Sequence, residues 1–279
     1  MITDSQTNGL YLSDLLQSRH PEFYSDFEKS LKQLSINVSF LTHTKDIWAV
    51  DYMPVQVKKD YFVQFVYEPD YLRKSAQGRK SITDSETVCK AIGISSVKSD
   101  VLIDGGNVVR SSNKVILCDK VLVENPSYSV KKLRQKLISL FEVEEVILIP
   151  TDPADPVGHA DGMLRFVDDN TVLINNYNNS DAQLMQKLVQ ILRSAGLNII
   201  SIPYNPYANK GKWDASGIYM NYLHMSHGIV LPVFNRKEDE AAIRQFEKLF
   251  PSLTIATVES SSLAEEGGIL NCISWNILK

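Results

Sequence analysis

The chain has 279 residues, 44% of them hydrophobic and 22% charged, which is typical of a soluble globular protein and excludes disorder as its main state. Its 29 basic and 33 acidic residues give a net charge of −4, which argues against nucleic acid as a partner. No run of about 18 apolar residues and no secretory signal is recognised, so no membrane partner is expected. Cys89, Cys118 and Cys272 form neither a disulfide framework nor a zinc pattern, so we expect a reducing, cytoplasmic setting.

The first predicted elements are a helix at residues 21–35 and a strand at residues 36–42. A unit of two strands, a helix and a third strand then fits residues 46–103. Its strands lie near DIWAVDYMPV, YFVQFVY and SSVKSDVLI, and its helix lies near DSETVCKAIG. A loop with more polar character is expected around residues 68–82.

The same unit recurs three times from about residue 101 onward. The copies begin with VLIDGGNVVR, GHADGMLRFV and SGIYMNYLHMS, in which Asn107, Asp161 and Ile218 occupy similar places. Each copy continues with a second short strand, an amphipathic helix and a third strand that ends as EEVILIP, LNIISIP or LTIATV. The helices carry apolar residues three or four positions apart, as in DAQLMQKLVQILRSAG.

A fifth unit is divided between the two ends of the chain. GGILNCISWNI at residues 267–277 supplies strand material, and residues 21–42 supply a helix and a strand. Five ββαβ units, the last closed by both ends, predict a closed, five-bladed α/β ring that forms a single domain over residues 1–279. Closure would also remove exposed strand edges, which favour aggregation. One irregular α/β domain without symmetry is the alternative.

The unusual polar residues fall at the starts of these units, which meet at one end of the axis of a closed ring. Cys272 follows the Gly267-Gly268 turn, and such a turn lets the backbone approach a ligand and aim a thiol into a pocket. A buried apolar cysteine is the alternative. Cys89 lies in a helix pattern and Cys118 in a strand pattern, so both are assigned to core packing.

His159 and Asp161 form a second candidate pair, because positions i and i+2 of a strand point to the same face. A histidine shuttles protons near neutral pH, so the pair indicates acid–base chemistry. A solvated surface pair is the alternative, and a metal-ligand role for His159 has no convergent ligand set. Asp51 lies among apolar neighbours and needs a partner, either a salt bridge or a ligand. Asp104 precedes a Gly-Gly pair and is either functional or a β-turn residue.

Together these segments provide one thiol, one imidazole and three carboxylates. Carboxylates bind a planar guanidinium through paired hydrogen bonds. A thiolate attacks the guanidinium carbon once the cation is held and polarised. The ordered set therefore predicts a site for a small cationic guanidine.

The motifs DIWAVDYMP, DGG, GHADGMLRF and EGGILNC also follow the order of a family pattern, D-x-W-x-R-D-x-x-P, E-G-G, G-H-x-D-x-x-x-x-F and G-G-G-x-x-H-C. From about residue 46 to the C-terminus the chain resembles the agmatine deiminase and bacterial peptidylarginine deiminase family, within the guanidino-group-modifying (pentein) superfamily. The resemblance implies a five-bladed, pseudo-symmetric α/β propeller of ββαβ units. It implies neither a metal nor an organic cofactor.

The resemblance also implies a role for each site residue. Cys272 would be the nucleophile, His159 the general acid and then the general base, and Asp104 the residue that orients and charges His159. Asp51 and Asp161 would clamp the guanidinium. The other residues of the implied substrate site are Trp48, Gly267 and Gly268. The implied reaction releases ammonia and passes through a covalent S-alkylthiouronium, with agmatine as the first expected substrate and arginine or peptidyl-arginine next.

The sequence departs from the family pattern at four places. The Arg of the pattern is Val50 here, its Glu is Asp104, the first Gly of its GGG turn is Glu266, and the His before its Cys is Asn271. These departures leave Cys272 and the two clamping aspartates unchanged. They do not determine which group the substrate carries at the end away from its guanidinium. The alternative functions are an amidinotransferase with the same Cys, His and Asp set, and a catalytically silent pentein that acts as a binding module. Homo-oligomerisation is left open.

Overall fold

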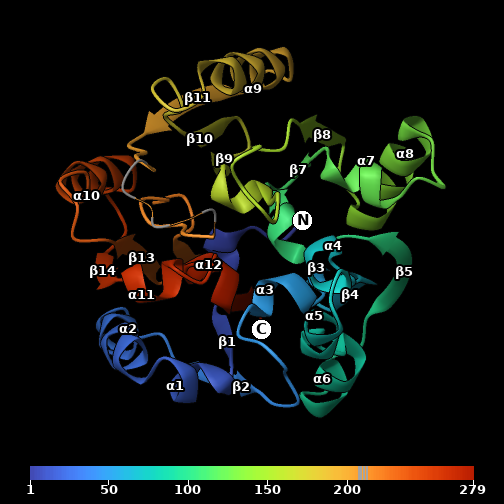
Figure 1. Ribbon diagram of the computed structural model, residues 1–279, viewed down its shortest axis with the longest axis horizontal. Coiled ribbons are helices and arrows are strands. Elements are labelled where there is room, and N and C mark those ends of the chain that lie inside the picture. The colour runs from blue at the N-terminus through green and yellow to red at the C-terminus, as the bar shows by residue number, and fades with distance from the viewer. Residues whose placement is uncertain (207–208, 210, 212) are drawn as a thin grey trace.

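The computed structural model describes residues 1–206, 209, 211 and 213–279, and the strands of this part form five three-stranded sheets around a central axis (Figure 1). Four sheets follow one another along the chain. Their strands, sheet by sheet, are β3 (Val55–Lys58), β4 (Tyr61–Val66) and β5 (Val97–Leu102); β6 (Val109–Arg110), β7 (Lys114–Cys118) and β8 (Glu145–Ile149); β9 (Leu164–Asp168), β10 (Thr171–Asn175) and β11 (Asn198–Ile202); β12 (Leu223–Met225), β13 (Gly228–Val233) and β14 (Ile255–Glu259).

The fifth sheet is built from both ends of the chain. Its order is β15 (Ser274–Ile277), β1 (Gly9–Ser13) and β2 (Val38–Leu41), with Gly9 opposite Ile277. In every sheet the first pair of strands is antiparallel and the second pair is parallel. The five predicted ββαβ units and the divided fifth unit are therefore confirmed, and the sheets stay separate rather than merging into one closed barrel.

A helix connects the two parallel strands of each unit and lies at the outside of the ring (Figure 1). These helices are α6 (Ser85–Ala91), α8 (Val130–Phe141), α9 (Ala182–Ser194), α10 (Asp239–Leu249) and α2 (Pro21–Gln33). In α9, the Asp181 side chain caps the N-terminus by accepting from the Leu184 N–H. Leu184, Leu188 and Leu192 then pack, buried, in one apolar cluster with Val172 of their own sheet and Ile116 of the preceding sheet, so the core is continuous between neighbouring units.

Short elements lie between the sheets and around the axis. They are η1 (Asp4–Gln6), α1 (Leu15–Arg19), α3 (Ala49–Tyr52), α4 (Asp70–Arg73), α5 (Ala76–Ser81), η2 (Gly105–Asn107), α7 (Lys120–Glu124), η3 (Ala160–Gly162), α11 (Ser261–Ala264) and α12 (Leu270–Ile273). The polar segment 68–82, expected to be a loop, thus contains two short helices. Cys89 lies in α6 and Cys118 in β7, both buried, which confirms their assignment to core packing.

Three segments that were expected to be strands are helical turns where they approach the axis. DIWAVDYMPV forms α3 before β3 begins, because the Asp46 side chain accepts from the Trp48 N–H and the Met53 N–H donates to the Ala49 carbonyl. GGILNCISWNI forms α12 before β15, and Ala160–Gly162 of the GHAD motif forms the 3-10 helix η3. The strand geometry predicted for His159 and Asp161 is therefore wrong.

Candidate active site

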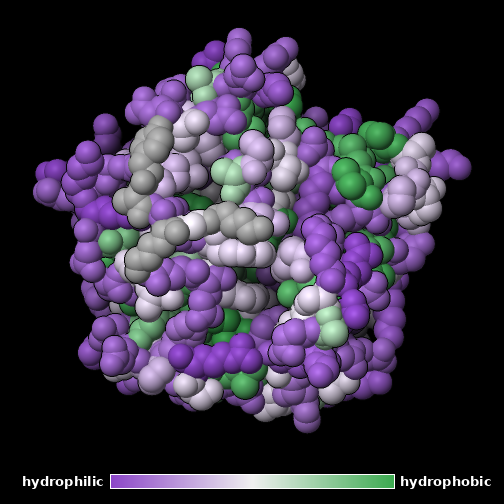
Figure 2. Space-filling view, viewed as in Figure 1, coloured by the Kyte–Doolittle hydropathy of each residue, from purple (hydrophilic) through white to green (hydrophobic). Residues whose placement is uncertain are grey.

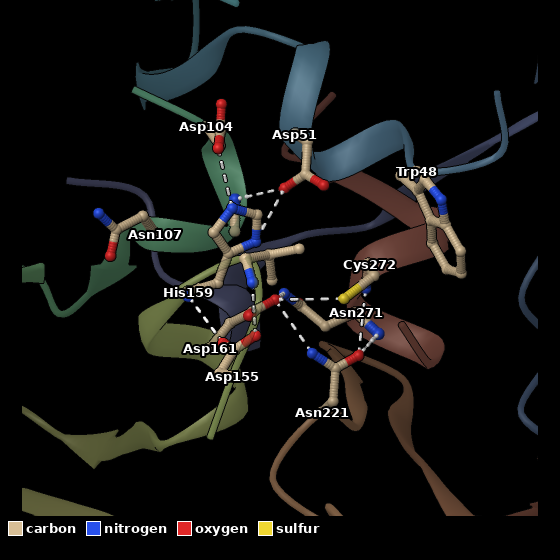
Figure 3. Close-up of polar contacts among 12 residues, drawn as sticks. Trp48, Asp51, Asp104, Asn107, Asp155, His159, Asp161, Asn221, Asn271 and Cys272 are labelled. Atoms are coloured by element: carbon tan, nitrogen blue, oxygen red, sulfur yellow. Dashed lines mark hydrogen bonds and ion pairs between the residues drawn. The ribbon is translucent and has the colours of Figure 1, made fainter. Parts of the chain in front are cut away.

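Each of the five units contributes at least one polar side chain to a single centre at the axis, from the segment just before its first strand. Asp51 precedes β3, Asp104 precedes β6, Asp161 precedes β9, Asn221 precedes β12 and Cys272 precedes β15. All five are buried. This confirms that the starts of the units meet, and Figure 3 shows their side chains directed toward one another around His159.

The His159 imidazole lies between two carboxylates (Figure 3). Its Nε2 is 3.0 Å from Asp104 Oδ2, and its Nδ1 is 3.6 Å from Asp51 Oδ1. Burial lowers the pKa of His159, but Asp51 and the hydrogen bond with Asp104 outweigh burial and raise it to about 9. The imidazole is therefore mainly protonated at neutral pH, the form in which it donates a proton.

Asp51 is held by a backbone contact that only glycine permits. Its Oδ1 accepts a hydrogen bond of 2.9 Å from the Gly106 N–H. A Cβ at Gly106 would lie 2.7 Å from Asp51 Oδ1, 2.7 Å from His159 Nδ1 and 3.4 Å from Asp161 Oδ2. Burial raises the pKa of the Asp51 carboxyl to about 7, although His159 opposes that shift. These acidic groups thus surround a small space next to the imidazole.

Cys272 lies at the other side of this space. Its Sγ is 3.7 Å from Asp161 Oδ2, and the same oxygen accepts from Asn271 Nδ2 at 2.7 Å and from Asn221 Nδ2 at 3.0 Å. Asn221 Oδ1 in turn accepts from the backbone N–H groups of Asn271 and Cys272. Burial raises the pKa of the Cys272 thiol, and Asp161 and Asp51 raise it further. The thiol is therefore not activated by the protein alone.

Lys120, which the sequence analysis did not single out, reaches the site from the start of α7. Its Nζ donates to Asp104 Oδ2 at 3.0 Å, the same oxygen that faces His159 Nε2. Burial raises the pKa of the Asp104 carboxyl, but His159 and Lys120 together lower it below its usual value. Asp104 is consequently an anion that two cationic groups share.

A cavity of about 270 Å³ opens beside the thiol. Its lining contains His159, Asp161 and Cys272, with Gly267 and Gly268 from the predicted turn. The lining also carries three further carboxylates and three aromatic rings. These residues are Asp152, Asp155, Asp214, Tyr177, Tyr204 and Trp213. The cavity therefore combines the thiol and the imidazole with additional acidic and aromatic side chains.

Two predicted substrate residues lie outside the lining of this cavity. Asp51 does not line the cavity itself, and its Oδ1 lies 3.6 Å from Nδ1 of His159, which does. Trp48 is half-buried and packs against Gly268, where a Cβ would collide with its ring. Gly267 has a φ of +102°, in the left-handed region that favours glycine. The Gly267-Gly268 turn thus allows Trp48 and Cys272 to approach each other.

The face of the molecule seen in Figure 2 is mostly hydrophilic, and hydrophobic residues form scattered patches on it. In residues 1–206, 209, 211 and 213–279, no three His, Cys, Asp or Glu side chains are grouped so that they could hold a metal ion. No helix of that part of the chain is long and apolar enough to cross a membrane.

Comparison with known families and proteins identifies relatives. The model of the family described as Porphyromonas-type peptidyl-arginine deiminase matches residues 15–277. A curated protein of Enterococcus faecalis named as an agmatine deiminase is 21% identical over 223 residues, which cover 68% of this chain and 61% of that protein. The chain thus spans less than two thirds of the length of this relative.

Solved structures share the fold across the whole chain. An agmatine deiminase of C. jejuni with substrate bound has a TM-score of 0.82 at 17% identity and covers 100% of this chain and 96% of its own. Dimethylarginine dimethylaminohydrolase of Pseudomonas aeruginosa has a TM-score of 0.60 at 13% identity, with 98% and 100% covered. The predicted pentein fold is therefore confirmed.

Proposed function

Because the chain belongs to the Porphyromonas-type peptidyl-arginine deiminase family, we propose that it hydrolyses a guanidinium group to a ureido group and ammonia, with Cys272 as the nucleophile. Such an enzyme is a hydrolase of C–N bonds other than peptide bonds. The observation that carries the proposal is the convergence of a thiol, an imidazole and paired carboxylates in one buried centre. Those groups match the charge and the reactivity of a guanidinium.

The first half of the proposed reaction begins with substrate-assisted activation of the thiol. A guanidinium held by Asp161 and Asp51 would place a positive charge beside Cys272 Sγ and lower the pKa that burial and the two carboxylates raise. The thiol would then lose its proton to solvent, and the resulting thiolate would form a bond to the guanidinium carbon. One C–N bond would break as His159 gives its proton to the leaving nitrogen, so that ammonia departs and an S-alkylthiouronium stays on Cys272.

The second half uses the same residues in reverse. His159, now neutral, would take a proton from a water molecule as that water attacks the thiouronium carbon. The C–S bond would break as the added hydroxyl gives its proton to the departing sulfur, which releases the neutral ureido product and restores the Cys272 thiol. Asp104 supports both halves, because an anion at Nε2 orients the imidazole and stabilises its protonated form.

The acidic lining of the cavity supports a substrate with a cationic tail. Asp152, Asp155 and Asp214 belong to that lining, so an ammonium in the cavity would meet negative charge and an α-carboxylate would be repelled. Asp155 itself accepts backbone N–H groups of Val157 and His159, which fixes its carboxylate in place. We therefore propose agmatine first, and arginine or peptidyl-arginine next.

The test is ammonia release from agmatine, arginine, a peptidyl-arginine and methylated arginines. We expect the highest kcat/KM for agmatine, and loss of all activity in Cys272→Ala because the nucleophile is removed. Cys89→Ala is the matched control, since Cys89 lies in α6, away from the site. Ammonia release that persists in Cys272→Ala would contradict the thiol mechanism.

The same assay separates the alternative functions. A product in which an added amine has taken the amidino group would identify a transferase. Binding of agmatine without turnover in the wild type would identify a binding module. Intact-protein mass spectrometry during turnover would detect the thiouronium on Cys272, and its absence from a rapidly quenched, active enzyme would contradict the covalent route.

A further inference from the structure

We infer that Lys120 is a positioning residue for this reaction, which fixes Asp104 and the loop before His159 and thereby sets how readily the imidazole gives up its proton. The inference rests on the proposed function. Lys120 does not line the described cavity and has no place among the reacting groups. It acts through Asp104, whose Oδ2 it shares with His159.

Lys120 is built into the site by several contacts. Only 11% of its side chain is exposed, and its Nζ donates to the Val157 carbonyl at 2.7 Å as well as to Asp104. Its stem lies next to Gly158, where a Cβ would be 3.2 Å from Lys120 Cδ. Val157 and Gly158 directly precede His159. The Lys120 ammonium therefore contacts both the Asp104 carboxylate, which faces the imidazole, and the loop that leads into His159.

The charges around this ammonium are mainly negative. Glu124 Oε1 is 3.4 Å and Asp70 Oδ1 3.5 Å from Nζ, and the Tyr71 ring centroid is 5.2 Å away. These contacts explain why a lysine that is largely buried remains charged. Lys120 and His159 both contact the same oxygen of Asp104. Each cation therefore weakens the electrostatic attraction between Asp104 and the other cation.

The proposed reaction needs His159 in both charge states, protonated for the departure of ammonia and neutral for the attack of water. The titratable and charged groups that face the imidazole are Asp51, Asp104, Asp161, Cys272, Tyr71 and Lys120. Asp51 and Asp104 favour the imidazolium, and Lys120 opposes it. Removal of Lys120 would therefore raise the pKa of His159 and slow the step that needs its neutral form.

The experiment compares Lys120→Met, which keeps the stem and removes the charge, with Lys120→Arg, which keeps the charge. We expect Lys120→Met to reduce turnover of agmatine at pH 7 by about 10-fold, which corresponds to a shift of about one pH unit in the ionisation of His159. The covalent intermediate should accumulate at pH 7, and turnover should recover as the pH rises above 9. Lys120→Arg should restore much of the rate.

Lys114→Met is the matched control, because it removes a lysine of the same unit whose Nζ contacts Asn113 and the Asp169 carbonyl instead. If Lys120→Met folds poorly, Lys120→Gln serves the same comparison. A loss of rate without a change in the pH profile or in the amount of intermediate would overturn the inference, since a merely structural lysine would behave in that way.

A direct titration separates this inference from the proposed function. The pKa of His159 is measured by NMR in Cys272→Ala with and without Lys120→Met, and the signal is assigned by its absence in His159→Gln. An increase of about one unit supports the inference even if no guanidine is turned over. An unchanged pKa would overturn the inference while leaving an active deiminase in place.

Discussion

Gly106 is the residue on which the spacing of Asp51 and His159 depends. Its N–H donates to Asp51, and its missing side chain leaves the space into which Asp51, His159 and Asp161 point. A methyl group there would be only 2.7 Å from a carboxylate oxygen and from an imidazole nitrogen. Because catalysis depends on the relative positions of such groups, a small displacement has a large effect on the rate.

We predict that Gly106→Ala lowers kcat/KM for agmatine by about 100-fold while the protein remains folded. Gly93→Ala should behave in the opposite way, since Gly93 has a φ of +72° and a methyl group added there would meet no atom within 4 Å. That variant should lose about 1 kcal/mol of stability and keep its activity. Steady-state kinetics and thermal melting distinguish the two, and equal activity in both variants would contradict the prediction.

The site also predicts a bell-shaped pH dependence. The clamp needs Asp51 as an anion, and the pKa of Asp51 is about 7, so kcat/KM should rise as the pH increases through about 7. The first step needs a protonated His159 with a pKa of about 9, so kcat/KM should fall above about 9. Measurement of kcat/KM for agmatine from about pH 5 to about pH 10.5 tests this prediction. A flat profile from about pH 6 to about pH 9 would argue against the roles given to Asp51 and His159.

Sequence reasoning singled out Asp51, Asp104, His159, Asp161 and Cys272, which lie together in the structure, because such residue types are unusual in apolar strands or next to paired glycines. It did not identify Asn221 or Lys120, whose neighbours at the site are more than ten residues away in sequence. In the third repeat, Ile218 takes the place that Asp161 has in the second, but the side chain that reaches Asp161 belongs to Asn221. An amide between Tyr219 and Tyr222 in a buried stretch is the signal that could have revealed it.

At the scale of elements, the long helices and central strands were predicted, and the short turns at the axis were not. The five outer helices follow from their apolar spacing, which needs no knowledge of the remaining chain. α3 and α12 read as strands because their residues are apolar nearly throughout. The turn of α12 depends on a contact made after the ring closes, in which the Asn271 N–H donates to the Asn221 carbonyl. The turn of α3 is held by local hydrogen bonds, which the apolar pattern of its residues does not reveal.

The N-terminal element η1 links units that are far apart in sequence. Asp4 pairs with Arg165 of β9 and with Arg110 of β6 at 3.0 Å, and Thr7 Oγ1 accepts from the Asn276 side chain of β15. Arg165 is itself buried and donates to the Tyr222 carbonyl. Burial raises the pKa of Asp4, but Arg165 and Arg110 outweigh burial and bring the pKa well below its usual value.

We predict that Asp4→Asn destabilises the protein by about 3 kcal/mol at pH 7, because it leaves the Arg165 guanidinium buried without its anion. A carboxyl whose pKa is depressed in the folded state stabilises the fold above its unfolded pKa and loses that contribution as the pH falls. The difference between wild type and variant should therefore shrink below about pH 4.

Urea unfolding at pH 7 and at pH 3.5 measures the effect of Asp4→Asn. Asp26→Asn is its control, since Asp26 pairs with Lys29 at the exposed surface of α2 and should change stability by less than about 0.5 kcal/mol. Equal small effects of both substitutions at pH 7 would show that η1 contributes nothing to the link between units.

For the whole molecule, we propose that residues 1–279 fold as a single domain. The support is the fifth sheet, in which β1 lies between β15 and β2 and so depends on both ends of the chain. A unit that lost its neighbours would expose both its sheet and the buried charges at the axis. The five units should therefore unfold together in one cooperative transition rather than independently of one another.

We predict one cooperative transition in urea, with coincident curves for far-UV circular dichroism and for tryptophan fluorescence. The first signal reports helices around the entire ring, and the second reports Trp48, Trp213 and Trp275, which come from three separate segments. Removal of residues 1–13 should abolish this transition, because it deletes both Asp4 and the central strand of the fifth sheet. Two resolved transitions in the wild type would contradict the single domain.

The divided fifth sheet also sets an order of events during synthesis of the protein. A ribosome makes β1 and β2 first, and it makes α12 and β15 only after the other four sheets. The edge of β1 that pairs with β15 therefore stays unpaired while the rest of the chain is synthesised. An unpaired edge of this kind is prone to aggregation at that stage. Cys272 closely precedes the strand that covers this edge, so the nascent chain gains its proposed nucleophile only as the ring is completed.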